Sequence, residues 1–305
     1  GGEVLYVGKA SNLRSRVRSY FSTNESRTKV GSLLKLMQGI QYIQTPDVLT
    51  AEVLELRIIG KLRPRYNRAG TRTEKYCYVR LTTEEEWPRL LISKTPSAKG
   101  ICIGPISTRN MASEVVDAIE SVIPLRRCTV RMGRNYVAPE GAPVCSAARL
   151  GLAQCPCSGT AEPESYANAV QLAADALMGK SNYVIEILTE RMNAHSAAQR
   201  FEEAAYLRDR IGTFETVLRR HSKAVQLCSR GQFSMQFNDI VYEIDNGVLA
   251  STHHVDQLFS PLGQVNSKIR EAISPPNSAV NDFGVLRNDV IDEVLCIAKF
   301  AEGKL

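Results

Sequence analysis

The 305-residue sequence predicts a mixed α/β protein (α+β) in which small sheets are flanked by helices. Three observations support this fold class. Short β-prone runs alternate with segments that have the 3.6-residue apolar period of amphipathic helices. Residues 163–221 contain two long helical patterns with few helix breakers. Farther on, the alternating run "IVYEIDNGVLAST" has Asn246-Gly247 at its centre, which is a strong signal for a β-hairpin.

The chain begins with a predicted strand, a turn and an amphipathic helix. Residues 4–7 are β-prone, the run stops at Gly8, and Ser11 is the expected N-cap of the helix. The helix places three apolar residues on one face: Leu13, Val17 and Phe21.

Polar side chains gather around the same strand and helix. Arg16 and Tyr20 are four residues apart and are therefore neighbours on the helix surface, and Lys9 lies at the exit of the strand. We therefore expect a guanidinium, an ammonium and phenols to meet in one small patch. The alternative is a solvated basic helix, with its arginines in water and Tyr6 in the core.

A second predicted helix, "TKVGSLLKLMQ", and a short predicted strand, "IQYIQ", precede the segment "LTAEVLELRIIGKLRPRYN". That segment is expected to be helical from its N-cap Thr50 until Pro64. Glu55 has no cation in the favourable register on this helix, since Ile58 and Ile59 follow it at three and four residues. A carboxylate on an apolar flank needs a partner, because burying it alone is costly. That partner is either a distant arginine or a metal ion.

The remaining elements are predicted in turn along the chain. "KYCYVRL" and "RLLISK" are strands, a turn is expected at Gly104-Pro105, and "MASEVVDAIESVI" is a helix. A loop-rich stretch from Cys128 to Gly159 follows, and a final helix lies near residues 289–300. These elements divide the chain into residues 1–72, 73–127, 128–160, 163–222 and 223–305.

The basic charge of the chain is concentrated in its first residues. Lys and Arg number 38 and Asp and Glu 32, for a net charge of +6, but residues 1–70 hold twelve of these cations against five carboxylates, a net +7. Such an excess is typical of a surface that binds a polyanion. No apolar run approaches the ~20 residues that span a bilayer, and no signal peptide is apparent, so we expect a cytoplasmic protein. In that reducing compartment, the eight cysteines are expected to be thiols or metal ligands rather than disulfides.

Two runs resemble the catalytic domain of the GIY-YIG nucleases: "LYVGKASNLRSRVRSYF" and "AEVLELRIIGKLRPRYN". The version they resemble is the one at the front of UvrC, the incising subunit of bacterial nucleotide excision repair. "IPLRRC", a cysteine cluster and "RFEEAAYLRDRI" follow in the order of that family, and the last of these resembles the UVR motif. The resemblance covers residues 1–222. It implies a GIY-YIG domain at 1–72, a linking α/β segment at 73–127, a cysteine cluster at 128–160 and a UVR helical hairpin at 163–222, followed by a hairpin-and-helix region.

The resemblance also implies a divalent-metal-dependent endonuclease that makes a single-strand incision in DNA. The implied catalytic residues are Tyr6, which orients or deprotonates the attacking water, Lys9 and Arg16, which hold the scissile phosphate, Tyr20, Glu55 and Asn67. Glu55 would be the single protein ligand of Mg²⁺ or Mn²⁺, and one carboxylate suffices because Mg²⁺ keeps water and substrate oxygens as its other ligands. The cations expected to contact the DNA backbone are Arg14, Arg18, Lys61, Arg63 and Arg65.

The first motif of this family, a Gly-Ile/Val-Tyr strand, belongs upstream of "GGEVLYVG". We expect it to have been cut off rather than lost, in which case the fragment by itself could be inactive. Some relatives also carry a DEDD-type 3′ to 5′ exonuclease upstream, and such an N-terminal neighbour is expected here. The alternative to an enzyme is a DNA-binding and partner-docking module with an incomplete nuclease site.

Four cysteines within thirty residues form a second candidate site: Cys128, Cys145, Cys155 and Cys157. Four thiolates suit an iron-sulfur cluster or zinc. UvrC relatives have a similar group, whose last two cysteines are usually separated by three residues, whereas "CPC" here separates them by one. Reduced thiols without a metal are the alternative. The other four cysteines are expected in the core: Cys77, Cys102, Cys228 and Cys296.

In UvrC, the hairpin equivalent to the last helical pair docks on a similar hairpin of the UvrB subunit. The resemblance therefore implies a UvrB-like partner, although the hairpin could instead pack only on its own chain. The implied docking residues are Phe201, Glu202, Glu203, Leu207, Arg208 and Asp209. UvrC also carries an RNase H-like nuclease, which we cannot place in this chain. The Asp and His residues in the C-terminal half of this chain have surroundings that do not match that site and are expected on the surface of a hairpin: Asp239, Asp245, His253 and His254.

Overall fold

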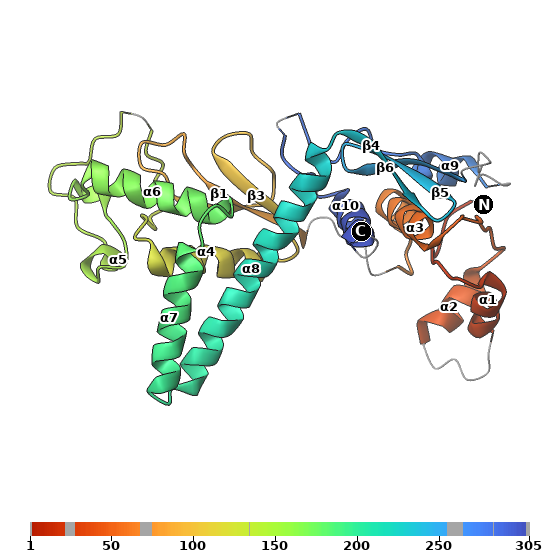
Figure 1. Ribbon diagram of the computed structural model, residues 1–305, viewed down its shortest axis with the longest axis horizontal. Helices are drawn as coiled ribbons and strands as arrows, with labels where there is room; N and C mark the ends of the chain where they lie inside the picture. Colours follow the sequence, from red (N-terminus) through yellow and green to blue (C-terminus); the bar gives the residue numbers. More distant parts are fainter. Residues whose placement is uncertain are drawn as a thin grey trace. The chain divides into compact units, whose positions relative to one another are not determined.

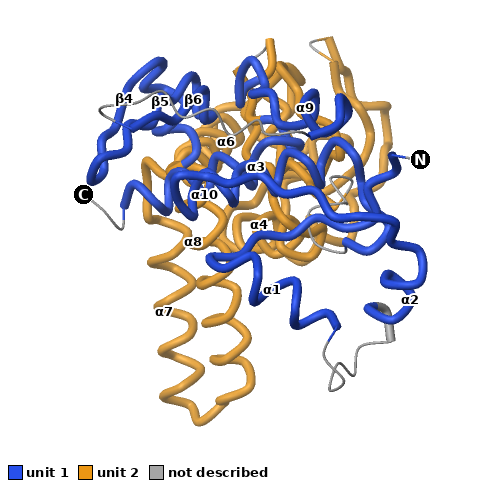
Figure 2. The backbone as a smooth tube through the Cα atoms, turned by 90° about the vertical axis from the view of Figure 1, so that its right-hand side faces the viewer, with its two compact units in different colours: residues 1–73, 224–280, 287–305 blue, residues 74–223, 281–286 orange. Residues whose placement is uncertain are grey.

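A computed structural model describes residues 2–21, 28–67, 75–133, 135–254, 265–282 and 284–302. The expected boundary between residues 72 and 73 lies outside these ranges. The chain forms two compact units (Figure 2). The first unit contains residues 1–73, 224–280 and 287–305, and the second contains residues 74–223 and 281–286. The N-terminal segment therefore shares a unit with the C-terminal segment of the chain.

Three helices lie in the N-terminal part of the first unit (Figure 1): α1 Leu13–Tyr20, α2 Thr28–Leu36 and α3 Val48–Leu62. The predicted N-caps of α1 and α3 are wrong. Asn12 caps α1 by accepting the N–H of Ser15, and Asp47 caps α3 by accepting the N–H of Thr50. The helix starts where a side-chain oxygen reaches the third helical N–H. Ser11 lies one residue too early for this, and Thr50 lies inside the helix.

The two strands predicted in this part, at residues 4–7 and 40–44, are also wrong, because neither segment is a strand in the structure. Residues 4–7 are tied to a turn instead of a sheet: the carbonyl of Leu5 accepts the N–H of Tyr66 at 3.0 Å. In the second segment, Ile40 is 53% exposed and Tyr42 is 69% exposed. Residues with high β-propensity form a strand when they pack on a half-buried, pleated surface. The side chains of this segment are exposed and have no such surface to pack on.

The C-terminal part of the first unit contains a three-stranded antiparallel sheet of order β4-β5-β6, formed by β4 Gln232–Phe237, β5 Ile240–Asp245 and β6 Val248–His254. The predicted hairpin is confirmed. Asn246 (φ 47°) and Gly247 (φ 85°) join β5 to β6, and both have the positive φ that tight hairpin turns require. Two helices follow, α9 Ser267–Ile273 and α10 Ile291–Glu302, so the predicted final helix is confirmed as well.

A buried ion pair joins α3 to the C-terminal part of the first unit. Arg57 and Glu293 of α10 have side chains that are 8% and 3% exposed, and they form two hydrogen bonds of 2.9 and 2.6 Å. Arg57 also donates to the carbonyls of Ile273 and Leu249, and Glu293 accepts the N–H of Leu249 at 2.9 Å. Both charges are therefore fully hydrogen-bonded, as buried charges must be. Ile58, the next residue of α3, packs against Ile273.

The second unit is built on a sheet of order β2-β1-β3, with β1 Cys77–Leu81, β2 Leu90–Ser93 and β3 Ile101–Ile106. The helix α4 Arg109–Val122 follows. These elements confirm the predicted strands and helix, but the predicted Gly104-Pro105 turn is wrong because both residues lie inside β3. The glycine is needed for a different reason. A Cβ on Gly104 would lie 2.9 Å from the carbonyl oxygen of Cys77, at an irregularity in the strand register.

After β3 and α4, the cysteine-bearing stretch contains only two short helical turns among the residues described there, α5 Ser146–Arg149 and η2 Pro156–Ser158. Three helices then follow instead of the two predicted: α6 Pro163–Leu177, α7 Tyr183–Ala197 and α8 Phe201–Ser229. A left-handed glycine explains the extra break, since Gly179 (φ 66°) follows Met178, the C-cap of α6. No helix in the described ranges is long and apolar enough to cross a membrane.

The core of the second unit joins its sheet to these helices. Val79 of β1, Ile119 of α4 and Leu177 of α6 are 0% exposed and belong to one cluster, which also includes Leu188 of α7 and Phe214 of α8. The helical pair α7–α8 is therefore anchored to the unit by its apolar residues.

Candidate functional site

Two tyrosines and an arginine meet where residues 2–10 pass α1. The rings of Tyr6 and Tyr20 pack edge to face, with centroids 5.9 Å apart and an angle of 66°. The guanidinium carbon of Arg16 lies 5.1 Å from the centre of the Tyr20 ring, so the predicted neighbour relation of these two residues is confirmed. Gly8 leaves room for the ring of Tyr6, because a Cβ there would be 2.9 Å from the phenol oxygen. The phenols and the guanidinium thus form one cluster.

Lys9 lies between two carboxylates on α3. Its ammonium nitrogen is 2.8 Å from Oε1 of Glu52 and 3.8 Å from Oε2 of Glu55. Burial raises the pKa of Glu55 above its ordinary value, although the charge of Lys9 opposes this. The hydrogen bond from Lys9 lowers the pKa of Glu52. The cation that the sequence could not supply to Glu55 is therefore a lysine from the preceding segment.

Asn67 fastens the segment that carries Tyr6 and Lys9. Its Oδ1 accepts the N–H of Val7 at 2.9 Å, and its Nδ2 donates to the carbonyl of Val7 at 2.8 Å. Because Val7 lies between Tyr6 and Gly8, this pair of hydrogen bonds fixes the backbone from which the phenol and the ammonium project. The turn after α3 thereby couples the helix of Glu55 to the segment of Tyr6 and Lys9.

The five cations expected to contact DNA are all exposed: Arg14, Arg18, Lys61, Arg63 and Arg65. Their surroundings differ. Lys61 lies 3.5 Å from the carboxylate of Glu271 on α9, in a pair whose side chains are 61% and 74% exposed. Arg63 caps α3 in the left-handed conformation (φ 47°), and Arg65 lies 6.0 Å from the ring of Tyr66. An exposed pair of this kind is screened by salt and remains able to exchange partners.

Two residues near Lys9 and Glu55 were not predicted from the sequence. Glu52 precedes Glu55 by three residues, which places both on one face of α3, and this spacing is the only local signal that could have found it. Cys296 of α10 hydrogen-bonds to Glu52, and the pKa of its thiol is raised to about 12 by burial and by that carboxylate. No pattern in the sequence relates residue 296 to residue 52.

The four clustered cysteines interact with one another in the second unit. The sulfurs of Cys155 and Cys157 are 3.0 Å apart. Hydrogen bonds from Cys145 and Cys157 help to lower the pKa of Cys155 to about 7 against the effect of burial, and burial raises that of Cys157, with further increases from the charges of Cys128 and Cys145. Four sulfurs are a donor set that suits zinc or an iron-sulfur cluster. Across the described residues, however, no three His, Cys, Asp or Glu side chains are arranged to hold a metal ion.

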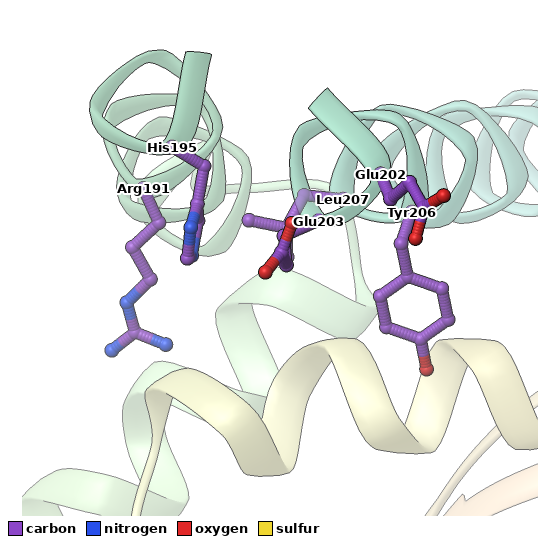
Figure 3. A pocket seen from close by; sticks show the side chains of 6 residues that line it. All are labelled: Arg191, His195, Glu202, Glu203, Tyr206 and Leu207. Carbon is purple, nitrogen blue, oxygen red and sulfur yellow. The ribbon is translucent and has the colours of Figure 1, made fainter. Parts of the chain in front are cut away.

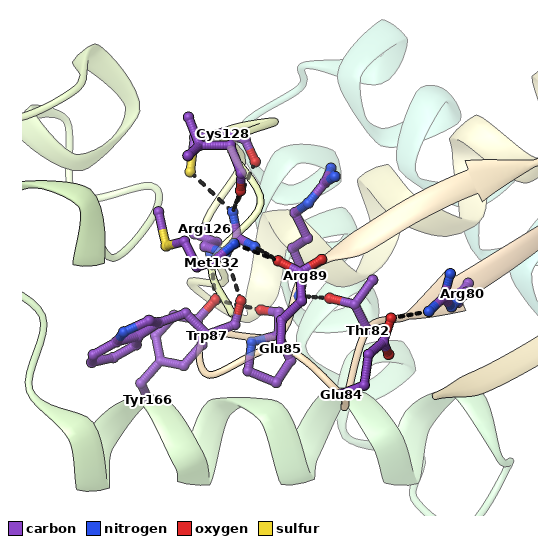
Figure 4. A network of polar contacts seen from close by, with 12 residues as sticks. Arg80, Thr82, Glu84, Glu85, Trp87, Arg89, Arg126, Cys128, Met132 and Tyr166 are labelled. Carbon is purple, nitrogen blue, oxygen red and sulfur yellow. Dashed lines mark hydrogen bonds and ion pairs between the residues drawn. The ribbon is translucent and has the colours of Figure 1, made fainter. Parts of the chain in front are cut away.

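A buried arginine organises the loop that carries Cys128 (Figure 4). Arg126, in the "IPLRRC" run, is 1% exposed. It donates to the carbonyl of Trp87 at 2.6 Å, to the carbonyl of Val130 at 2.7 Å and to the sulfur of Cys128 at 3.2 Å, and it forms an ion pair with Glu85. The guanidinium of Arg126 thus holds the backbone of residues 126–130 in place through hydrogen bonds, and it also fixes the position of the Cys128 sulfur.

The helical pair α7–α8 holds an open pocket of about 560 Å³ (Figure 3). Its lining comes from both helices: Arg191, His195, Glu202, Glu203, Tyr206 and Leu207. Of the expected docking residues, Phe201 is 66% exposed, and Arg208 and Asp209 form an exposed ion pair of 2.8 Å. Leu207 differs from these, because it is half-buried and packs against the core of the unit.

The residues considered for a second nuclease lie in or beside the sheet of the first unit, but the predicted surface position holds only for Asp239, because Asp245, His253 and His254 are half-buried. Asp239 is exposed in the turn between β4 and β5, Asp245 ends β5 and accepts a hydrogen bond from Asn246, and His253 and His254 end β6. They do not form a metal-holding group with one another.

The family comparisons confirm the resemblance. Residues 1–68 match the family model of the UvrC-like GIY-YIG domain, residues 76–176 that of the UvrC/Cho excinuclease middle domain, and residues 182–216 that of the UvrB/uvrC motif. The residues of the tyrosine cluster, Lys9, Glu55 and Asn67 all lie within the first match.

Curated relatives agree with these matches. The UvrABC system protein C of Clostridium novyi is 34% identical over 223 residues, which are 72% of this chain and 35% of that protein. The protein of the same name from Desulforudis audaxviator is 33% identical over 262 residues, which are 84% of this chain and 42% of that protein. The chain thus spans well under half the length of the curated relatives it matches. No solved structure matches it.

Proposed function

The chain belongs to the UvrC-type GIY-YIG family, and from that premise we propose that it is a divalent-metal-dependent endonuclease that makes a single-strand incision in DNA during nucleotide excision repair. The observation that carries the proposal is the arrangement around residues 6–9. On one side, Tyr6 contacts Tyr20, which Arg16 covers, and on the other side Lys9 reaches Glu55. A structural basic helix needs no such grouping of phenols, cations and a half-buried carboxylate. Because the proposed substrate is DNA, we also propose a cytoplasmic location.

The residues divide the work of phosphodiester hydrolysis. Glu55 would hold Mg²⁺ or Mn²⁺, which when bound supplies charge at the scissile phosphate. Arg16 is exposed and can bind phosphate oxygens whose charge increases in the transition state. The phenol of Tyr6 orients the attacking water by a hydrogen bond, and the packing of its ring against Tyr20 limits its movement. Asn67 holds the backbone between these groups.

The test of the proposed activity is nicking of a damaged duplex by the full-length protein. Nicking should require Mg²⁺ or Mn²⁺, and Glu55→Gln should abolish it while leaving DNA binding nearly intact, because the substitution removes the metal ligand but no cation. Glu271→Gln is the matched control. It also removes a carboxylate that pairs with a lysine of the first unit, but that lysine is Lys61 rather than Lys9. Cutting without a divalent metal would reject the proposal.

We propose that the four clustered cysteines hold an iron-sulfur cluster, with zinc as the alternative. Their mutual interactions support a common ligand, and the loop must adjust to bring the sulfurs into a coordinating arrangement. Protein purified without oxygen should be brown, and Cys155→Ser should bleach it, while Cys102→Ser, in β3, should not. Colourless protein with stoichiometric zinc would favour a structural zinc site.

We further propose that the α7–α8 pair docks on a UvrB-like protein. The exposed side chain of Phe201 and the pocket lined in part by the next residues, Glu202 and Glu203, support this, because large side chains that fill pockets carry much of the binding energy of interfaces. Phe201→Ala should weaken binding of a UvrB-like subunit by about 10-fold or more. Leu172→Ala, at an exposed apolar residue of α6, should not change it. Equal effects of the two substitutions would contradict docking at the pair.

A further inference from the structure

Lys9 interacts with both carboxylates of α3, and its backbone N–H also hydrogen-bonds to Glu55, but its ammonium lies nearer to Glu52. Its nitrogen lies at hydrogen-bond distance from Glu52, 2.8 Å, but at 3.8 Å from Glu55. An ammonium bound fully to Glu55 would compete with a divalent cation for the same oxygens. Whether the ammonium of Lys9 binds Glu52 or Glu55 therefore determines how accessible the Glu55 carboxylate is to a metal ion.

Glu52 is held in place from its other side by the C-terminal part of the first unit. The thiol of Cys296 hydrogen-bonds to its carboxylate. Cys296 lies on α10, one turn after Glu293, and Glu293 is fixed to α3 through the buried pair with Arg57. Glu52 thus has a fixed donor on α10 as well as the ammonium of Lys9.

We propose that Glu52 is a positioning residue that holds the ammonium of Lys9 and thereby leaves the Glu55 carboxylate to the divalent cation. The inference rests on the proposed nuclease function, because it assigns a role in keeping that site ready for its metal. It assigns Glu52 no contact with DNA or with the metal.

A purely stabilising role does not account for the pair equally well. The side chains of Lys9 and Glu52 are 33% and 40% exposed. Ion pairs of this exposure contribute little to stability, because water and salt screen them. The loss of Glu52 should therefore leave the fold intact, and its effect should appear at the metal instead.

The test measures Mn²⁺ binding by electron paramagnetic resonance in the full-length protein without DNA, so that turnover is not involved. Glu52→Gln should weaken Mn²⁺ binding by about 10- to 100-fold, the usual effect of removing an outer-shell partner of a metal site. In nicking assays, raising the Mn²⁺ concentration should overcome the defect. Glu271→Gln removes the carboxylate of α9 that pairs with Lys61 of α3. It should bind Mn²⁺ like the wild type, and thermal unfolding should show that both variants are folded.

A double variant separates positioning from direct ligation. When Lys9→Met is added to Glu52→Gln, no ammonium remains to occupy Glu55, so Mn²⁺ affinity should return to nearly the wild-type value. A double variant as weak as Glu52→Gln would mean that Glu52 is itself a ligand and would overturn the inference. Wild-type affinity in Glu52→Gln would also overturn it while leaving the nuclease proposal in place. If the wild type and Glu55→Gln bind Mn²⁺ equally, the proposed metal site fails, and this inference fails with it.

Discussion

The buried pair of Arg57 and Glu293 gives the most quantitative prediction for the first unit. Replacing Glu293 by Gln keeps the size of the side chain but removes the charge that faces the guanidinium of Arg57, whose side chain is only 8% exposed. Breaking a buried pair from one side costs about 3–5 kcal/mol, because the remaining charge is uncompensated. Typical domains have about 5–15 kcal/mol of stability in total, so a large share would be lost.

Urea unfolding can measure this loss separately in the two units. Trp87 is the only tryptophan and lies in the second unit, whereas circular dichroism reports helices of both. With a slope of about 2 kcal/mol per molar urea, the expected loss moves the transition of the first unit by roughly 1.5–2.5 M. The fluorescence transition of Trp87 should move less than the dichroism transition.

Two further variants test the reasoning. Glu271→Gln breaks the exposed pair with Lys61 and should cost at most about 1 kcal/mol. Combining Glu293→Met with Arg57→Met removes both charges, so the double variant should be less destabilised than the sum of its parts by about 2–3 kcal/mol. Additive losses, or a loss for Glu293→Gln no larger than that for Glu271→Gln, would refute the role assigned to the pair.

Three other outcomes are expected. Arg16→Ala should lower the single-turnover rate at saturating DNA by about 10²- to 10³-fold, whereas Arg14→Ala should leave that rate unchanged and reduce the salt dependence of binding by about one counterion; equal behaviour would favour a module that only binds DNA. Asn67→Ala should destabilise the first unit by about 1–3 kcal/mol in urea unfolding, because the backbone of Val7 loses both of its partners. Burial raises the pKa of Glu120, whose side chain is 13% exposed, to about 7. The folded protein therefore keeps a proton that the unfolded chain loses near pH 4.5, and stability falls as the pH rises from there to 7. Glu120→Gln should remove this fall. The stability of the variant minus that of the wild type, measured by thermal unfolding, should therefore increase between pH 5 and 7.5 and reach up to about 3 kcal/mol.

Local signals in the sequence predicted the elements that depend on local interactions. Arg16 and Tyr20 are neighbours because both are on one helix, and the β5–β6 hairpin forms because Asn246 and Gly247 tolerate positive φ. The predicted strand at residues 4–7 failed because a strand needs a neighbouring ladder, which no local pattern specifies. The backbone of Leu5 pairs with Tyr66 instead, and that contact is set by the turn after α3.

The environment of the candidate site could not be predicted, because it depends on contacts between distant parts of the chain. Arg57 and Glu293 are 236 residues apart. The sequence did show that Glu55 lacks a cation on its own helix, which was a correct indication of a long-range partner. It could not show that Lys9 is this partner, or that Glu52 competes for the same ammonium.

The helix that carries Glu55, α3, is bound by residues of the C-terminal segment through three separate contacts. Tyr242 of β5 donates to the capping carboxylate of Asp47, Cys296 hydrogen-bonds to Glu52, and Glu293 pairs with Arg57. The family models matched here end at residue 216, so all three contacts come from beyond the matched part of the chain. A chain shortened to the matched part would leave the Arg57 guanidinium without its carboxylate and expose Ile58 of α3. Because breaking that pair alone costs about 3–5 kcal/mol, the matched residues are a poor choice of boundary for isolating an active nuclease domain.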